Sequence, residues 1–264
     1  YGCSVIAASL KELELKDYFA PLNWRDVNKY DWDIGCTSPV LFAHRNRTLL
    51  AGGGKEGVVY LMDAAELGGK DHHTPLFTTP RLGNDEDSFQ GTGIWGGLSA
   101  WQDDKGDSWV YVPMWGPVSK HAPKFPMTNG PNPSGSIMAF KVSGTESKPI
   151  LEPAWISGDF KVPEPVVIAN GVVFALSNGE NVNQTREGGL IFAPKQTMLN
   201  DLQRKENTER AVLYALDAKT GKVLYQSGNA IDTWVHFSGL ALANGQVYAV
   251  DSNSQVYCFG LKGK

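Results

Sequence analysis

The sequence has few cysteines, no strongly basic region and no long apolar run. Only Cys3, Cys36 and Cys258 occur in 264 residues, and no two of them form a CxxC or CxxCH motif. This spacing argues against a cysteine metal site and against covalently attached haem. We expect the three thiols to be small buried hydrophobic side chains, with a disulfide between two of them as the alternative.

The charge and the apolar runs exclude two further classes of protein. The formal net charge is −4, and lysine and arginine form no basic stripe, which argues against binding to nucleic acid. No apolar run reaches the length of a membrane span. The chain opens with Tyr1-Gly-Cys-Ser-Val-Ile-Ala, which is typical of a strand, so we expect a leader and further residues to precede Tyr1.

The sequence is rich in turn formers and large aromatic residues. It contains 29 glycines, 15 prolines and 8 tryptophans, and 42% of its residues are hydrophobic. From Ala211 to Tyr225, an alternating strand, the turn Asp217-Ala-Lys-Thr-Gly221 and a return strand follow one another. Gly221 can adopt the positive φ that closes such a turn, so this stretch predicts a β-hairpin.

Related units recur along the chain. Ile168-Ala-Asn-Gly-Val-Val-Phe is closely matched by Leu242-Ala-Asn-Gly-Gln-Val-Tyr, and each Asn-Gly pair predicts a type I′ turn. Four units share the order strand, polar turn, strand and further strand. They run over 38–63, over 97–115 with 135–142, over 165–179 with 211–225, and over 239–261.

Repeated all-β units of this size predict a β-propeller whose blades are four-stranded antiparallel sheets. We expect about four blades and part of a fifth in one region, 1–264. A β-sandwich is the competing fold, but it does not require the same pattern four times. Two stretches interrupt the repeat, the Pro-rich loop 116–134 and the insert 180–210, whose second half contains good helix formers.

The signature Ala215-Leu-Asp217-Ala-Lys-Thr220-Gly221 resembles that of the pyrroloquinoline-quinone (PQQ) repeat family. Tyr225 stands where this family has a tryptophan that docks one blade onto the next. The resemblance covers nearly the whole chain and is strongest in the units over 165–225 and 239–261. It implies a bacterial PQQ-like propeller related to quinoprotein alcohol dehydrogenases, of which this chain would be the C-terminal part.

The resemblance also implies candidate site residues. Asn28-Lys-Tyr-Asp31-Trp32-Asp33 is similar to the stretch that holds the catalytic aspartate in those enzymes, and Gly54-Lys55-Glu56-Gly57 to the turn that holds a basic residue. Asp33 or Asp31 would then take the proton of an alcohol, and Lys55 would hold a quinone oxygen. The family's histidine before the aspartate, its asparagine in the turn and its adjacent cysteine pair are absent.

Each candidate also has a structural interpretation. Lys55 suits an exposed hairpin tip, and Asp31 and Asp33 suit the capping of a turn. Trp95 precedes one unit and His236 precedes the last, so both are candidate channel-facing residues for cofactor binding; core packing is the alternative for Trp95 and a structural role for His236. We predict no metal site: His72-His73 lies in a polar loop and is better explained as a surface pair than as metal ligands.

Two functional hypotheses follow. One is a non-catalytic binding or scaffold module of the bacterial cell envelope, active within an electron-transfer complex or on another envelope protein. The other is a PQQ-dependent oxidoreductase that oxidises an alcohol or sugar, with PQQ and calcium as cofactors. The resemblance implies a periplasmic or secreted location. Four blades form an open arc, so we expect the remainder of the ring to come from an N-terminal part or from another polypeptide.

Overall fold

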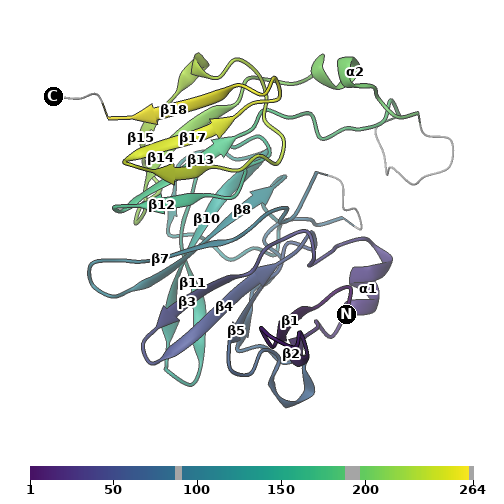
Figure 1. Ribbon diagram of the computed structural model, residues 1–264, viewed down its shortest axis with the longest axis vertical. Helices are drawn as coiled ribbons and strands as arrows, with labels where there is room; N and C mark the ends of the chain where they lie inside the picture. Colours follow the sequence, from purple (N-terminus) through teal and green to yellow (C-terminus); the bar gives the residue numbers. More distant parts are fainter. Residues whose placement is uncertain (87–90, 188–196, 262–264) are drawn as a thin grey trace.

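The computed structural model describes residues 1–86, 91–187 and 197–261. Five sheets of mainly antiparallel strands follow one another along the chain, from β1–β2 at one end of the long axis to the C-terminal strands at the other (Figure 1). The described residues include two short α-helices, α1 (Trp24–Lys29) and α2 (Asp201–Lys205). Two single-turn 3-10 segments, η1 (Gly69–Asp71) and η2 (Gly228–Ala230), lie in loops.

Four of the sheets are the blades of a β-propeller, and the two-stranded first sheet corresponds to part of a fifth, as the sequence predicts. The first sheet pairs β1 (Val5–Ala8) with β2 (Leu15–Phe19). We number the four blades I to IV. Blade I contains β3 (Val40–His44), β4 (Arg47–Gly53), β5 (Val59–Asp63) and β6 (Phe77–Thr78). Blade II contains β7 (Ser99–Gln102), β8 (Ser108–Trp115), β9 (Met127–Thr128), β10 (Gly135–Gly144) and β11 (Pro149–Ile156).

The remaining blades are formed by the third and fourth repeat units. Blade III contains β12 (Val167–Ala169), β13 (Val172–Ser177), β14 (Val212–Asp217) and β15 (Val223–Gln226). Blade IV contains β16 (Ala241–Ala243), β17 (Gln246–Val250) and β18 (Val256–Gly260). Strand number therefore varies: β9, from the loop 116–134, adds in parallel to the edge of blade II, and blade IV has three strands. Helix α2 lies within the insert 180–210.

The cores lie between successive blades. Leu49 and Leu61 of blade I pack in one buried cluster with Val110 and Phe140 of blade II. Further clusters join blade II to blade III, blade III to blade IV, and the first sheet to blade I. Blades I, II and III thus bury both of their faces against neighbouring sheets, which explains continuous apolar runs such as β8 within a mainly antiparallel fold.

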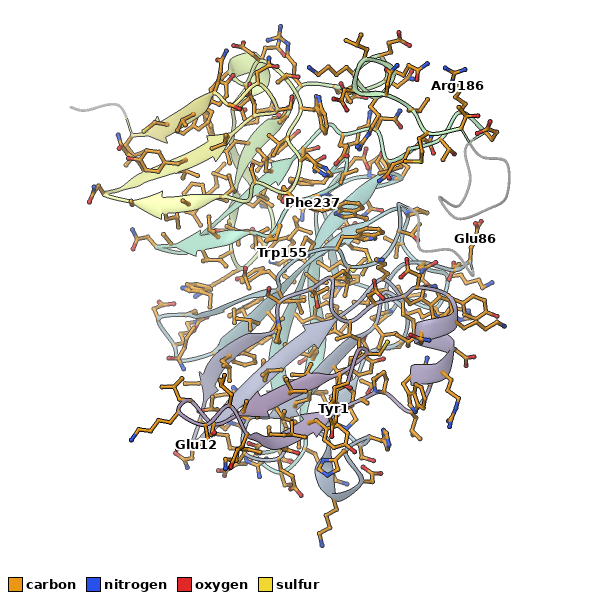
Figure 2. All side chains as sticks on the ribbon, turned by 45° about the vertical axis from the view of Figure 1, so that its right-hand side comes forward. Tyr1, Glu12, Glu86, Trp155, Arg186 and Phe237 are labelled. Atoms are coloured by element: carbon orange, nitrogen blue, oxygen red, sulfur yellow. The ribbon has the colours of Figure 1, made fainter. Side chains whose placement is uncertain are left out.

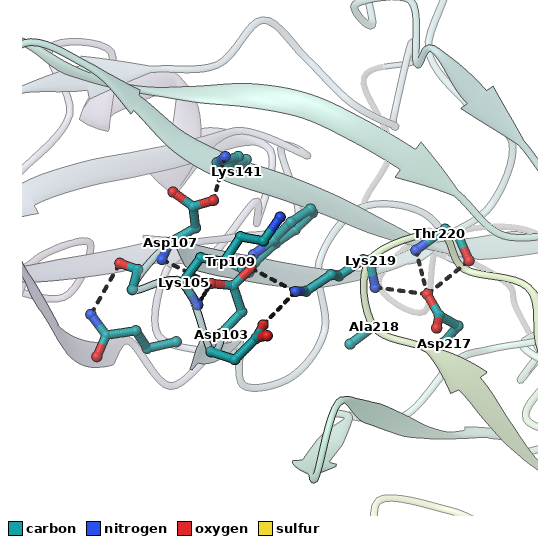
Figure 3. A network of polar contacts seen from close by, with 12 residues as sticks. Asp103, Lys105, Asp107, Trp109, Lys141, Asp217, Ala218, Lys219 and Thr220 are labelled. Carbon is teal, nitrogen blue, oxygen red and sulfur yellow. Dashed lines mark hydrogen bonds and ion pairs between the residues drawn. The ribbon is translucent and has the colours of Figure 1, made fainter.

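The repeat signature builds the contact between blades II and III. The carboxylate of Asp217 accepts hydrogen bonds from the backbone N–H of Thr220 (2.8 Å) and of Lys219 (3.1 Å), closing the turn (Figure 3). Gly221 has φ +69°, and a Cβ there would lie 2.4 Å from Cε3 of Trp155. Trp155 of blade II donates its indole N–H to the carbonyl oxygen of Ala218 (2.9 Å). The docking indole on this turn is Trp155, whereas Tyr225 is 47% exposed.

An ion-pair network reinforces the same interface. Lys219 extends from the signature turn to Asp103 Oδ2 (3.1 Å) and Asp104 Oδ1 (2.7 Å) of blade II, as Figure 3 shows. Asp103 Oδ2 also accepts from the indole N–H of Trp109 (3.4 Å). Hydrogen bonds from Lys219 and from backbone amides lower the pKa of Asp103 to about 2, despite the opposing effect of its burial.

Candidate functional site

An axial cavity is formed by the loops that lead into the first strands of all four blades. The first strands β3, β7, β12 and β16 lie next to one another, blade to blade, and therefore line the propeller axis. The cavity has a volume of about 480 Å³. Its chemically informative lining residues are Cys36 and Ser38 before β3, Lys55 between β4 and β5, Trp95 before β7, Glu164 before β12 and Phe237 before β16.

The Lys55 ammonium group is held by two carboxylates and an indole ring. Its Nζ lies 2.9 Å from Asp33 Oδ2, 3.3 Å from Asp31 Oδ2 and 4.5 Å from the centroid of the Trp95 ring. Lys55 is only 6% exposed, so it is not a solvated hairpin tip. The carboxylates and the ring face offset the desolvation of its charge by ion pairing and by a cation–π interaction.

The backbone fixes Lys55 at this place. Its carbonyl oxygen accepts a hydrogen bond of 2.7 Å from the side-chain amide of Asn84. Gly93, with φ +87°, runs directly beneath it, and a Cβ on Gly93 would lie 2.0 Å from the Lys55 carbonyl oxygen. Only glycine permits this approach, which places Trp95 two residues later against the lysine.

Asp31 is the less well compensated of the two aspartates. Burial raises its pKa, the nearby Lys55 ammonium lowers it, and the negative charge of Asp33 raises it again, with a net increase. Its backbone has φ +56°, an unusual conformation outside glycine. One ammonium thus serves two carboxylates, and the group formed by Asp31, Asp33 and Lys55 has an excess of negative charge.

Aromatic rings connect the Lys55 side of the site to blade IV. Trp95 stacks on Trp115 with centroids 4.9 Å apart and an angle of 5° between the planes. The Trp115 ring in turn stacks on Phe237 at 5.8 Å and 10°. Phe237 lies in the middle of the molecule, where the upper and lower blades meet (Figure 2). This parallel stack forms a rigid apolar element beside the cavity.

His236 belongs to a second polar cluster. Its Nδ1 lies 2.8 Å from Oε2 of Glu180, and the other carboxylate oxygen of Glu180 is bonded to the guanidinium group of Arg204. Arg204 comes from α2 and lies over the Trp234 ring, 5.6 Å from its centroid. The insert 180–210 therefore brings a cation to blade IV. The His236 ring contacts Phe237 at 4.3 Å, which joins this cluster to the aromatic stack.

Glu164 is a site residue that the sequence analysis missed. Its side chain is 2% exposed, and its Oε1 accepts hydrogen bonds from Asn178 Nδ2 (3.1 Å) and from the backbone N–H of Phe237 (2.9 Å). Burial raises its pKa, and these two hydrogen bonds oppose the increase only in part. One sequence signal could have identified it. Glu164 lies shortly before the first strand of a blade, as do Trp95 and His236.

The structure thus brings together Asp31, Asp33, Lys55 and Trp95, and it places His236 in the neighbouring cluster. The expectation of buried cysteines is wrong for Cys258, which is exposed, and Cys3 and Cys36 are half-buried; all three are free thiols. Cys36 donates to the carbonyl oxygen of Asp33 (2.9 Å), and burial raises its pKa to about 11. Among the residues that the structure describes, no group of three or more His, Cys, Asp or Glu side chains could hold a metal ion.

The fold and the cavity define the chain as a β-propeller with an axial site. Its fold is similar to that of BamB from Moraxella catarrhalis, with a TM-score of 0.50 and 11% identity over 100% of this chain and 57% of BamB. It is also similar to a europium-containing methanol dehydrogenase, with a TM-score of 0.51 and 12% identity over 98% of this chain and 44% of that enzyme. The chain therefore spans about half the length of these structures. At such identity the likeness shows the fold alone.

No protein-family model matches the sequence, and no curated protein matches it at a significant level. Within residues 1–86, 91–187 and 197–261, no helix is long and apolar enough to cross a membrane.

Proposed function

We propose that the chain is part of a larger propeller of the PQQ-repeat type and acts as a binding or scaffold module in the periplasm or secreted space of a bacterium. The observation that carries this proposal is the internal pairing of the charged groups near the axis. Lys55 is bonded to Asp31 and Asp33, and Glu180 is bonded to Arg204 and His236. Charged groups that are paired within the protein in this way hold the loops around the axis in place, as a binding platform requires.

The two end sheets supply the binding surface in this proposal. Ile6 of β1 is 54% exposed and Leu15 of β2 is 42% exposed. At the opposite end, Val256 of β18 is 68% exposed and Leu242 of β16 is 37% exposed. Apolar side chains on a blade face are normally covered by the next blade, so both ends suit further blades, from the same polypeptide or from another.

Photo-crosslinking in cells tests this role. A photoreactive amino acid placed at Ile6 or at Val256 is expected to crosslink to a blade of the same ring or to one defined envelope protein. The matched control is Lys148, an exposed residue in the tight turn between β10 and β11. Equal crosslinking at all three positions, or none at Ile6 and Val256, would refute a specific contact at the end sheets.

The alternative function is a PQQ-dependent oxidoreductase acting on an alcohol or sugar. One observation favours it: the fold brings Asp33, Lys55 and the Trp95 ring into contact beside a cavity, as the family resemblance implies. One structural neighbour is also an enzyme by its name, a methanol dehydrogenase. In this role Asp33 would accept the alcohol proton and Lys55 would donate a hydrogen bond to a quinone oxygen, while PQQ would take up the hydride.

A titration with PQQ and Ca²⁺, followed by tryptophan fluorescence, separates the two functions. If the chain acts only as a scaffold, we expect no saturable quenching in the ring-complete protein and no difference between wild type and Lys55→Ala. Quenching that requires Ca²⁺ and is lost in Lys55→Ala would support the oxidoreductase instead. The tryptophan fluorescence should respond to a ligand in the cavity, because Trp95 lines the cavity and Trp115 stacks on the Trp95 ring.

A further inference from the structure

The lining of the axial cavity contains a buried carboxylate, that of Glu164, with one oxygen available. Both hydrogen bonds found on Glu164 among the described residues go to Oε1, from Asn178 and from the Phe237 amide. Neither of these two bonds reaches Oε2. Glu164 lines the cavity, and only 2% of the residue is exposed. A buried carboxylate oxygen that faces a cavity is costly unless a hydrogen-bond donor or a cation reaches it.

Within residues 1–86, 91–187 and 197–261, no ion pair is formed by this carboxylate. Among the ion pairs found in the described residues, Arg204 and His236 serve Glu180, and Lys55 serves Asp31 and Asp33. The positive charge of Lys55 is therefore already exceeded by its own two aspartates. A second cation in the cavity would meet an environment that is negative in sum, although one ammonium group lies in its wall.

An aromatic surface lies directly beside Glu164. The Phe237 ring is 52% exposed and lines the same cavity. Its backbone has φ +51° and is held there by the hydrogen bond from its amide to Glu164, which fixes the ring relative to the carboxylate. Aromatic faces attract cations, as the contact of Lys55 with Trp95 in the same cavity illustrates. Rigid placement of both groups lowers the entropic cost of binding.

We propose that the axial cavity binds the ammonium group of an organic amine, with Glu164 Oε2 as its counter-ion, the Phe237 ring against the cation, and the apolar body of the ligand along Trp95. This site goes beyond the scaffold function and needs no quinone. The ammonium group can belong to a free amine or to a lysine side chain of a bound protein, since the recognition chemistry is the same.

Binding of a cation at Glu164 depends on whether its carboxyl group is protonated. Burial raises the pKa of Glu164, and the hydrogen bonds from Asn178 and Phe237 and the charge of His236 lower it in part, while Glu180 raises it. Lys55, which lines the same cavity, is paired with Asp31 and Asp33. Only the ionised carboxylate pairs with an ammonium group. Affinity for the amine is therefore expected to increase as pH rises through the raised pKa, and binding below that pKa releases a proton.

Isothermal titration of the folded protein tests the proposal with three probes: phenethylammonium, its neutral analogue 2-phenylethanol, and Nα-acetyl-lysine methylamide. We expect phenethylammonium to bind with a Kd on the order of 1 mM or tighter, and at least about tenfold more tightly than the alcohol. Comparable binding of the lysine derivative identifies a protein side chain as the ligand source. Its failure to bind, when phenethylammonium binds, identifies a free amine.

Two variants and one proton measurement decide the outcome. Glu164→Gln keeps a carbonyl oxygen for Asn178 and Phe237 but removes the charge, and should abolish the preference for the amine over the alcohol. Glu152→Gln, an exposed carboxylate of β11, is the matched control and should leave the preference intact. If Glu164→Gln does not fold, proton release measured on wild type in buffers of different ionisation enthalpy replaces it. Equal affinity for amine and alcohol, an unchanged preference in Glu164→Gln, or binding without proton release at low pH would overturn the proposal.

Discussion

Trp155→Ala is expected to lower the free energy of unfolding by about 3 to 5 kcal/mol, the usual cost of removing a fully buried tryptophan. Trp155 is 0% exposed and lies between blades II and III. The substitution removes the ring on which Gly221 packs and the hydrogen bond of 2.9 Å to the Ala218 carbonyl oxygen. Ala218 retains a second donor, the hydroxyl group of Tyr111 at 3.1 Å, which limits the loss from unpaired polar groups.

Urea denaturation of a graded series checks this result. Trp155→Phe keeps most of the apolar volume and loses the indole N–H, so it should cost about 1 to 2 kcal/mol. Tyr225→Ala is the matched control, since Tyr225 stands at the equivalent point of the next blade but is half-exposed, and it should cost less than about 1 kcal/mol. A larger effect of Tyr225→Ala than of Trp155→Ala would contradict the assignment of the blade contact to Trp155.

Lys55→Met is expected to destabilise the protein by about 2 kcal/mol at neutral pH. Removing one partner of a buried ion pair typically costs about 3 to 5 kcal/mol, but the carboxylates of Asp31 and Asp33 are partly exposed, and solvent screens part of this loss. The variant leaves two neighbouring carboxylates without their shared cation. Asp33→Asn introduced together with Lys55→Met should restore part of the stability, because one of the two negative charges is then absent.

The effect of Lys55→Met should depend on pH with a definite sign. In wild type the pKa of Asp31 is raised above its ordinary value of 3.8, so the folded state favours the protonated carboxyl group. This preference stabilises the folded state at pH values below 3.8 and is lost as the pH rises through the raised pKa. Without Lys55 the pKa of Asp31 rises further, and the loss grows. Denaturation at about pH 3.5 and about pH 7.5 should therefore show a small difference between wild type and variant at the lower pH and a large one at the higher. A difference independent of pH would show that Lys55 stabilises the site through packing.

Local sequence signals were sufficient to predict the blades. The Asn-Gly pairs at 170–171 and 244–245 have positive φ at both residues, as type I′ turns require, and Gly221 closes the signature turn with φ +69°. These signals are local, because turn chemistry and strand alternation act over a few residues. Strand number was less predictable. The addition of β9 to blade II depends on where a loop returns in space, and no pattern within Met127–Thr128 specifies it.

The Lys55 site was predicted only in part. Asp31, Asp33 and Lys55 could be proposed together from their family resemblance, but the burial of Lys55 depends on Gly93, Asn84 and Trp95, which come from later parts of the chain. Glu164 and Arg204 carried no motif. Glu164 became a site residue because the loop before β12 meets the loop before β16 at the axis.

The fold, a β-propeller of repeated antiparallel blades, could be predicted from the residues alone, because hairpin turns and apolar strands are encoded within each unit. The contacts of side chains at the axis and between blades could not be predicted in this way. Trp155 reaches the signature turn of the next blade, and Lys55, Glu164 and Phe237 from three different blades line one cavity. Such meetings depend on the angle and spacing between sheets, which result from the packing of whole blade faces and leave no local pattern in the sequence.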